Sequence, residues 1–229
     1  MNLFFNINVD TAKCINGCTL FNDFSEFSYW ENREATSDEK YISNYLKENN
    51  LLVDKKILHV GIGNSHIAMN ATNFMKIEGI TLSKNEIDYG KKLNISNYDI
   101  YFQNKYSNES LFLTTLNYYD IIIDVNLKSF SCCNKAFSNL FKIYSKMLNP
   151  KGMLITGREG IKWSRQIKPV LSFSLKKFFY RRLKEFNGPN SNMLNEDDCF
   201  KLAQKFNLSL DLNDPNIIIF KKNEKNFNI

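Results

Sequence analysis

The sequence predicts an α/β fold: a doubly wound, Rossmann-like sheet in a three-layer α/β/α arrangement, mostly parallel, with a C-terminal antiparallel hairpin strand. Three observations predict it. Short apolar runs alternate with amphipathic segments along the chain, as in parallel strands joined by crossover helices. The first apolar run, 57–60, leads into a turn that contains Gly61 and Gly63. The last two runs, 208–212 and 217–220, flank an Asn-Asp-Pro-Asn turn that is typical of a hairpin.

Two helices are expected ahead of the first strand. They span 24–31 and 37–49, and both belong to an N-terminal cap over residues 1–50. Ser37 is a good N-cap for the second helix because its hydroxyl can accept a hydrogen bond from a backbone N–H of the first turn. The acidic residues that follow suit the positive end of the helix dipole. The second helix is therefore expected to start at this serine.

The second strand and its helix follow the glycine turn. Residues 77–83 read as a strand, and the polar segment 84–93 reads as a helix. Ser83 is the expected N-cap of this helix, and Glu86 stands three residues later, which is the spacing of a capping box. This pair predicts where the helix begins.

The second half of the sheet is predicted from three strands and one helix. Strands are expected over 98–103 and 119–124, and the latter ends in a carboxylate. Residues 135–148 place apolar side chains at i, i+3, i+4 and i+7, which predicts a helix. The Asn-Pro-Lys-Gly segment 149–152 is expected to end that helix before a strand over 153–156. Ligands of such sheets bind beyond the carboxyl ends of the strands, so the carboxylate is expected to face a site.

From about residue 57 to residue 220 the chain resembles the class I S-adenosylmethionine-dependent methyltransferases. The resemblance rests on four signals that occur in the family's order. They are the turn 59–65, the strand end 79–83, the strand 119–124, and the Leu-Asn-Pro-Lys-Gly unit 148–152. A glycine pair alone is a weak signal, and the ordered combination is much stronger.

The whole chain is expected to form one domain. Its parts are an N-terminal helical cap (1–50), a cofactor-binding half (51–157), a lid or substrate insertion (158–195), and a C-terminal helix and hairpin (196–229), with the helix at 196–206.

The resemblance implies one cofactor, S-adenosylmethionine, and a site made from the matching motifs. The implied cofactor-binding residues are His59, Gly61, Gly63, Asn64, Ser65, Thr81, Leu82, Glu86, Asn104 and Asp124. Asp124 is also the expected catalytic residue, because a carboxylate at the end of a central strand could hold the cofactor's ammonium group or orient and deprotonate an acceptor. Two structural roles stay open, a turn cap at Asp124 and a capping-box partner at Glu86.

Several positions depart from the family pattern. The first strand carries His59 where the family has an acid, so no opposite charge is available for the cofactor's ammonium. Thr81 replaces the usual Asp, as it does in the cyclopropane fatty acid synthase branch, which residues 79–86 resemble. Asn104 can supply the amide hydrogen bonding expected near adenine. With Thr81 at the ribose position and His66 at the third glycine position, the chain does not fit a nicotinamide-dependent dehydrogenase.

The acceptor is expected to be a small molecule. Trp30 and the start of the insertion, with Arg158 and Lys162, should close over it, and the two cations favour an anionic or carboxylate-bearing group. Basic and aromatic residues interleave over 162–184. This segment could hold an acidic substrate, RNA or an anionic membrane surface, but an amphipathic cap with its aromatic residues packed inward is the favoured interpretation.

Composition narrows the class of protein. Hydrophobic residues make up 43% of the 229 residues, which is enough for one core, and no apolar run is long enough to predict a transmembrane helix. A net charge of +6 is not by itself a nucleic-acid signature, so no nucleic-acid partner is expected, and peripheral membrane contact stays open without a supporting motif. The first residues lack the pattern of a signal peptide. An odd number of cysteines suits a reducing, cytoplasmic compartment.

No metal site is expected. Cys14 and Cys18 lie four residues apart, but no second pair or histidine cluster is expected to join them, so zinc is not predicted. The adjacent Cys132 and Cys133 are interpreted as packing at the edge of a helix.

The leading hypothesis is a methyltransferase that acts on a small-molecule acceptor. An aminopropyl transferase that uses decarboxylated cofactor is the alternative, because the strand 119–124 also resembles that family and the first-strand acid is missing. A third hypothesis is a non-catalytic domain of the same fold, motivated by His59 and Lys105.

Overall fold

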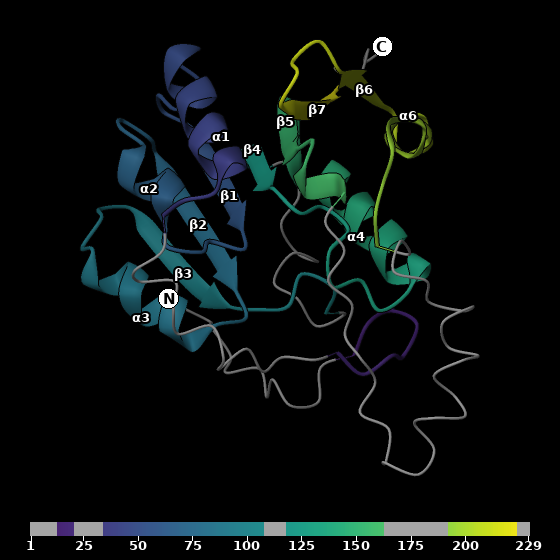
Figure 1. The fold of residues 1–229 in the computed structure, drawn as a ribbon, viewed down its shortest axis with the longest axis horizontal. Coiled ribbons are helices and arrows are strands. Elements are labelled where there is room, and N and C mark those ends of the chain that lie inside the picture. The colour runs from purple at the N-terminus through teal and green to yellow at the C-terminus, as the bar shows by residue number, and fades with distance from the viewer. Residues whose placement is uncertain (1–12, 21–33, 108–117, 163–191, 224–229) are drawn as a thin grey trace, which may run out of the picture.

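A computed structural model describes residues 13–20, 34–107, 118–162 and 192–223, and its centre is one sheet in the order β3-β2-β1-β4-β5-β7-β6 (Figure 1). The strands are β1 Lys56–Val60, β2 Lys76–Thr81, β3 Tyr98–Phe102, β4 Tyr119–Asp124, β5 Leu148–Gly157, β6 Leu208–Asp211 and β7 Ile217–Lys222. β1 to β5 run parallel, and β7 lies antiparallel between β5 and β6. The predicted doubly wound sheet with a C-terminal antiparallel hairpin is confirmed.

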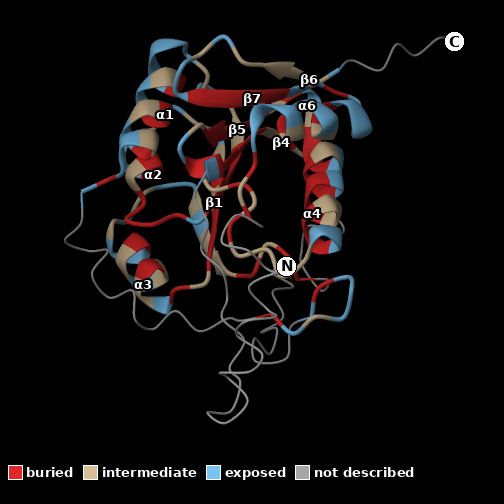
Figure 2. Cartoon of the chain, turned by 45° about the vertical axis from the view of Figure 1, so that its right-hand side comes forward, coloured by how far each residue is buried: buried red, intermediate tan, exposed pale blue. Residues whose placement is uncertain are grey.

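Helices cover both faces of this sheet. They are α1 Ser37–Glu48, α2 His66–Asn70, α3 Lys84–Lys92, α4 Asn134–Met147 and α6 Glu196–Lys205, with a 3-10 turn at Gly160–Lys162. α1, α2 and α3 lie on one side of the sheet, and α4 and α6 lie on the other (Figures 1 and 2). The buried side chains divide into two clusters in the same way. The predicted three-layer arrangement is therefore confirmed.

The two core layers differ in their side chains. The layer under α1 and α2 is aliphatic and includes Ile42, Ile57 and Ile123. The layer under α4 and α6 contains aromatic rings, with the Phe141 centroid 5.0 Å from that of Phe220. Each such side chain stabilises the fold by about 1.5–3 kcal/mol when it is fully buried. The central strands β1 and β4 are thus buried on both faces, as is typical of a parallel sheet covered by helices.

The N-cap of α1 is Thr36, so the prediction of Ser37 is wrong by one position. The Thr36 Oγ1 accepts a hydrogen bond from Glu39 N (3.2 Å), and the Glu39 carboxylate accepts one from Thr36 N (2.7 Å). This capping box satisfies two backbone donors at once. Only the threonine has a glutamate three residues later, which explains the choice.

β5 begins earlier than predicted. Tyr119 pairs with Leu148, and Ile121 pairs with Met153, so residues 149–152 bulge opposite a single residue of β4. The Asn149 side chain donates to Asp120 Oδ1 (3.0 Å) and ties the bulge to β4. The Asn-Pro-Lys-Gly segment therefore ends α4 as expected, but it belongs to the strand that follows.

Some predicted features lie outside the described residues. These are the helix over 24–31, Trp30 and most of the insertion, residues 163–191. In the part of the chain that the structure describes, no helix combines the length and apolar character needed to cross a membrane.

Candidate functional site

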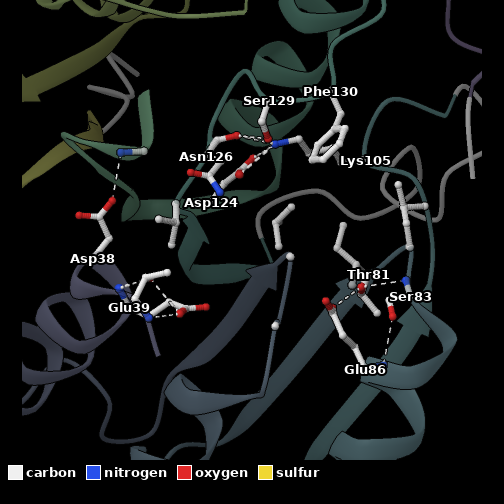
Figure 3. Close-up of a pocket in the computed structure, with 18 of the residues that line it drawn as sticks. Asp38, Glu39, Thr81, Ser83, Glu86, Lys105, Asp124, Asn126, Ser129 and Phe130 are labelled. Carbon is white, nitrogen blue, oxygen red and sulfur yellow. Dashed lines mark hydrogen bonds and ion pairs between the residues drawn. The ribbon is translucent and has the colours of Figure 1, made fainter. Parts of the chain in front are cut away.

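A cavity of about 500 Å³ lies at the carboxyl ends of β1, β2 and β4, where the topology predicts a ligand site (Figure 3). Cofactor and small-molecule sites commonly occupy roughly 300–1,000 Å³. The start of α1, the start of α3 and the loops that follow β3, β4 and β5 complete the described lining.

The glycine turn after β1 forms one wall of the cavity. Gly61 and Gly63 line it, with φ values of 72° and 54°. A Cβ at Gly61 would meet no heavy atom within 4 Å, so the main chain here faces open space. The Gly61 N–H donates to the Ile80 carbonyl oxygen (2.8 Å) and holds the turn against β2. A ligand can therefore approach the backbone closely at this point.

Thr81 links the end of β2 to a carboxylate on α3. Its Oγ1 accepts a hydrogen bond from Ser83 N (3.1 Å) and donates to Glu86 Oε2 (2.5 Å). Ser83 caps α3 as predicted, by accepting from Glu86 N (3.3 Å). In the predicted capping box the Ser83 N–H would also donate to the Glu86 carboxylate. Here Thr81 stands between them, because its hydroxyl accepts from the Ser83 N–H and donates to the Glu86 carboxylate. All three residues are buried at the cavity wall, which places an acid at the end of β2 by way of α3 (Figure 3).

The loop after β3 supplies two amide side chains. Asn104 lines the cavity as predicted, and its Oδ1 accepts from Tyr106 N (2.9 Å). Gln103, which the sequence did not single out, also lines the cavity. Its Nε2 is buried and donates to no acceptor among the described residues. A buried amide donor without a partner is costly, so this group favours a ligand oxygen nearby.

Asp124 lies at the end of β4 and lines the cavity, as predicted, but it is paired inside the protein. Lys105 Nζ donates to Asp124 Oδ1 (2.9 Å) and Oδ2 (2.8 Å), and Tyr144 OH donates to Oδ2 (2.9 Å). Lys105 Nζ also donates to the carbonyl oxygens of Asn126 (3.1 Å) and Leu127 (3.2 Å). Burial raises the pKa of Asp124 and lowers that of Lys105, and their mutual contact opposes both changes. Among the described residues, the carboxylate thus accepts from Lys105 and Tyr144 and not from the backbone N–H groups of the following turn.

The start of α1 closes the opposite side of the cavity. Asp38 Oδ2 accepts a hydrogen bond from Gly160 N (3.0 Å), which joins α1 to the loop after β5. Burial raises the pKa of Asp38. A Cβ at Gly157 would lie 2.3 Å from Asp38 Oδ2, so the glycine leaves room for this contact. Asp38, Glu39 and Glu159 together give this wall an acidic character.

Three predicted cofactor residues do not line the cavity: His59, Asn64 and Ser65. Side chains alternate along a strand, and His59 shares its face with Ile57 in the layer under α1 and α2. Its ring is fully buried, and neither ring nitrogen has a hydrogen-bond partner among the described residues. Burial lowers the pKa of His59 to about 4. Ser65 is also buried, with its Oγ 3.0 Å from Tyr98 OH. The His59 side chain therefore lies outside the described cavity lining, and its contact with the cofactor stays a prediction.

The two predicted acceptor-binding cations also lie away from the cavity lining. Arg158 donates from Nε to the Asp214 carbonyl oxygen (2.8 Å) and from a terminal nitrogen to the Leu212 carbonyl oxygen (2.6 Å), and it pairs with Glu196. It therefore holds the hairpin turn. Lys162 is exposed and pairs with Glu159 (2.7 Å).

Two cysteine pairs that are far apart in the sequence meet in the fold. Cys14, Cys18, Cys132 and Cys133 come together, with all four Sγ atoms within 4.8 Å of one another. The premise that no second pair joins Cys14 and Cys18 is therefore wrong. Spacing along the chain could not reveal this, because the two pairs meet only through the fold.

Comparison with known proteins bears on the fold. No family model and no curated protein sequence matches the chain. Among solved structures, it is similar to a magnesium protoporphyrin IX methyltransferase from Synechocystis PCC 6803 with bound SAH, with a TM-score of 0.56 and 12% identity over 88% of this chain and 95% of that chain. It is also similar to a SAM-dependent methyltransferase from Methanosarcina mazei, with a TM-score of 0.53 and 14% identity over 78% and 97%. The chain thus has the class I S-adenosylmethionine-dependent methyltransferase fold.

Proposed function

We propose that the protein is an S-adenosylmethionine-dependent methyltransferase acting on a small-molecule acceptor. One observation carries the proposal: in this fold, the open main chain at Gly61 and the Thr81–Glu86 hydrogen bond border one cavity at the ends of adjacent parallel strands. The likeness to solved methyltransferases supports the same conclusion.

The residues present suit an adenosyl amino acid. The Glu86 carboxylate is an acceptor suited to ribose hydroxyl groups, and Ile80 and Leu82 offer apolar surface to a purine. Gln103 offers a buried donor, and the backbone at Gly61 leaves space for the methionine portion. In this proposal Asn104 borders the adenine, as the resemblance implies.

S-adenosylmethionine, when bound, supplies a methyl group that is already activated toward nucleophiles. The protein's part is to hold an acceptor in line and to exclude water, and such positioning can contribute about 7–11 kcal/mol. We assign no proton transfer to Asp124, because both of its carboxylate oxygens accept from Lys105 Nζ. In this proposal the aspartate fixes the loop that carries Lys105 and does not touch the reacting atoms.

The charge of the described lining favours a cationic or neutral acceptor over an anionic one. The lining includes the carboxylates of Asp38, Glu39, Glu86, Asp124 and Glu159, and a single ammonium group, that of Lys105. Because Arg158 and Lys162 lie outside it, an anionic acceptor would find little opposite charge among the described residues.

Calorimetric titration with S-adenosylmethionine tests the proposal. We expect binding by the wild type and a loss of tenfold or more in Glu86→Gln, since a hydrogen bond to a charged group contributes about 1.5–3 kcal/mol. Glu48→Gln, on the exposed end of α1, is the matched control and should bind normally. Absence of binding at about 1 mM cofactor, where sites of about −4 kcal/mol register, would contradict the proposal.

The aminopropyl transferase alternative is favoured by the acidic wall formed by Asp38, Glu39 and Glu159. Decarboxylated cofactor lacks the carboxylate that this wall would repel, and an amine acceptor would be attracted to it. Parallel titrations with intact and decarboxylated cofactor separate the two enzymes, because each should prefer its own form. A screen of acceptors for a methyl or aminopropyl mass gain then separates either enzyme from a non-catalytic domain.

A further inference from the structure

Four cysteine thiols form a compact cluster next to the cavity wall. Cys14 and Cys18 come from the described N-terminal turn, and Cys132 and Cys133 come from the loop that leads into α4 (Figure 1). Every pair of Sγ atoms in the cluster lies within 4.8 Å. The fifth cysteine, Cys199, is buried in α6 and does not belong to it.

The first pair sits on a tight turn that presents both sulfurs. Cys14 N donates to the Cys18 carbonyl oxygen (3.0 Å), and Gly17 N donates back to the Cys14 carbonyl oxygen (2.8 Å). An antiparallel bridge closes the turn, and Gly17 adopts φ 77°, a conformation that glycine permits. Asn16 N donates to Cys14 Sγ (3.3 Å). A backbone N–H directed at a sulfur offsets the negative charge of a thiolate ligand.

The second pair is held by the start of α4. Cys133 is the N-cap of this helix, and its Sγ accepts from Ala136 N (3.4 Å). Ser131 Oγ donates to the Cys133 carbonyl oxygen (2.9 Å), which fixes the turn before the helix. The helix dipole also favours negative charge at this end. Both pairs are therefore built on ordered backbone that supplies donors to sulfur.

We propose that Cys14, Cys18, Cys132 and Cys133 bind one Zn²⁺ ion as a structural tetrathiolate site. Sulfurs about 2.3 Å from a tetrahedral zinc lie about 3.8 Å from one another. The observed upper limit of 4.8 Å is close to that spacing, so small side-chain rotations bring the four sulfurs onto one ion. Four protein ligands fill the coordination sphere and leave no open position for substrate.

A disulfide bond between Cys132 and Cys133 does not explain the cluster. Consecutive Cα atoms across a trans peptide lie about 3.8 Å apart, whereas disulfide-bonded residues usually have Cα atoms about 4.4–6.8 Å apart. Cys132 and Cys133 are consecutive and trans, so they do not suit a bond to each other. A single ion uses all four sulfurs at once.

The proposed ion would join two segments that are distant in the sequence. Ser129 and Phe130, which line the cofactor cavity, lie directly before the second cysteine pair. Tyr106 OH donates to the Ser129 carbonyl oxygen (2.9 Å), which links the same loop to the one after β3. Zinc would thus hold the N-terminal turn against this wall.

The test begins with the metal content of the full chain purified without added metal. We expect about one zinc per chain in the wild type and in Cys199→Ala, and below about one tenth in Cys132→Ser/Cys133→Ser. Because the double variant could fail to fold, a mercurial titration of the wild type is run in parallel. Release of one zinc as four thiols react would support the site.

Cobalt provides the second measurement. Co²⁺ added to the metal-free wild type should give the visible spectrum of a tetrahedral thiolate complex, and zinc should displace it. Three results would overturn the proposal: stoichiometric iron in place of zinc, a Cys14–Cys18 disulfide in protein purified under reducing conditions, or neither zinc nor a cobalt thiolate spectrum. Cofactor binding is measured separately, so failure of this site leaves the proposed methyltransferase function unaffected.

Discussion

Lys105 Nζ lies 2.9 Å and 2.8 Å from the two carboxylate oxygens of Asp124, and both side chains are largely withdrawn from water. Taking two such charges out of water is costly, and the cost is recovered only when the remaining donors and acceptors are satisfied. Tyr144 and two carbonyl oxygens provide those contacts here. The pair thereby fixes the loop after β3 to the end of β4 at the floor of the cavity.

Removing one partner of this pair should be much worse than removing both. Lys105→Met leaves the Asp124 carboxylate buried without its cation, and we expect the free energy of unfolding to fall by about 3–5 kcal/mol in urea denaturation. Lys105→Met/Asp124→Leu removes both charges and should recover much of the loss. Equal destabilisation of the single and double variants would show that the charges do not interact as described.

The Gly61 turn allows a matched test of ligand contact. Gly61→Ala and Gly17→Ala each place a side chain at positive φ, 72° and 77°, with no heavy atom within 4 Å of the new Cβ. Each should lose about 1–2 kcal/mol of stability from backbone strain. Only the Gly61 variant should also weaken S-adenosylmethionine binding in calorimetry, since only this residue lines the cavity. Equal affinities of the two variants would count against the proposed cofactor position.

His59 should make stability depend on pH. Burial lowers the pKa of His59 from 6.5, its ordinary value in an unfolded chain, to about 4 in the folded protein. As the pH falls, the unfolded chain is therefore protonated at this ring before the folded protein is. Stability contributed by the neutral ring is present above the unfolded pKa and is lost as pH falls toward 4.

Comparison with His59→Leu isolates this effect from other titrating groups. When the pH is lowered from about 7.5 to about 5, the free energy of unfolding of the wild type, measured in urea, should fall by about 2 kcal/mol more than that of the variant. If the free energies of unfolding of the two proteins differ by the same amount at both pH values, the ring is not buried as a neutral group.

The contact between Gly157 and Asp38 predicts a rescue experiment. A Cβ at position 157 would lie 2.3 Å from Asp38 Oδ2, so Gly157→Ala should shift α1 and cost about 1–3 kcal/mol in thermal unfolding. Asp38→Ala/Gly157→Ala removes the obstructing carboxylate and should be more stable than Gly157→Ala alone. If the double variant is the less stable of the two, the clash is not the cause.

Strand positions were the most predictable part of the fold. β4 has the predicted bounds, Tyr119–Asp124, because a run of isoleucines buried on both faces is a strong local signal. Capping was less predictable, since Thr36 and Ser37 are chemically similar neighbours and only the pairing with Glu39 separates them. The bulge at residues 149–152 depends on pairing with β4, which no local pattern reports.

The candidate site was predictable where it depends on the ends of strands. Gly61 and Thr81 meet at the cavity because parallel strands place their carboxyl ends together. The partners of Asp124 were not predictable, because Lys105 reaches it only through the fold. The position of the His59 side chain follows from the alternation of side chains along a strand, which places it on the opposite face from Val60, a residue that lines the cavity.

The close packing of α1 and of the loop after β4 against the end of β5 and the residues beyond it gives a sequence feature that can identify distant relatives. An added Cβ would lie 1.9 Å from the Val125 carbonyl oxygen at Gly160 and 2.3 Å from a carboxylate at Gly157. Mutations at these positions should be removed by selection wherever the same packing persists. Two glycines three residues apart, the first at the end of β5 and the second just beyond it, would then outlast most other similarity and trace descent where overall identity has fallen too low to do so.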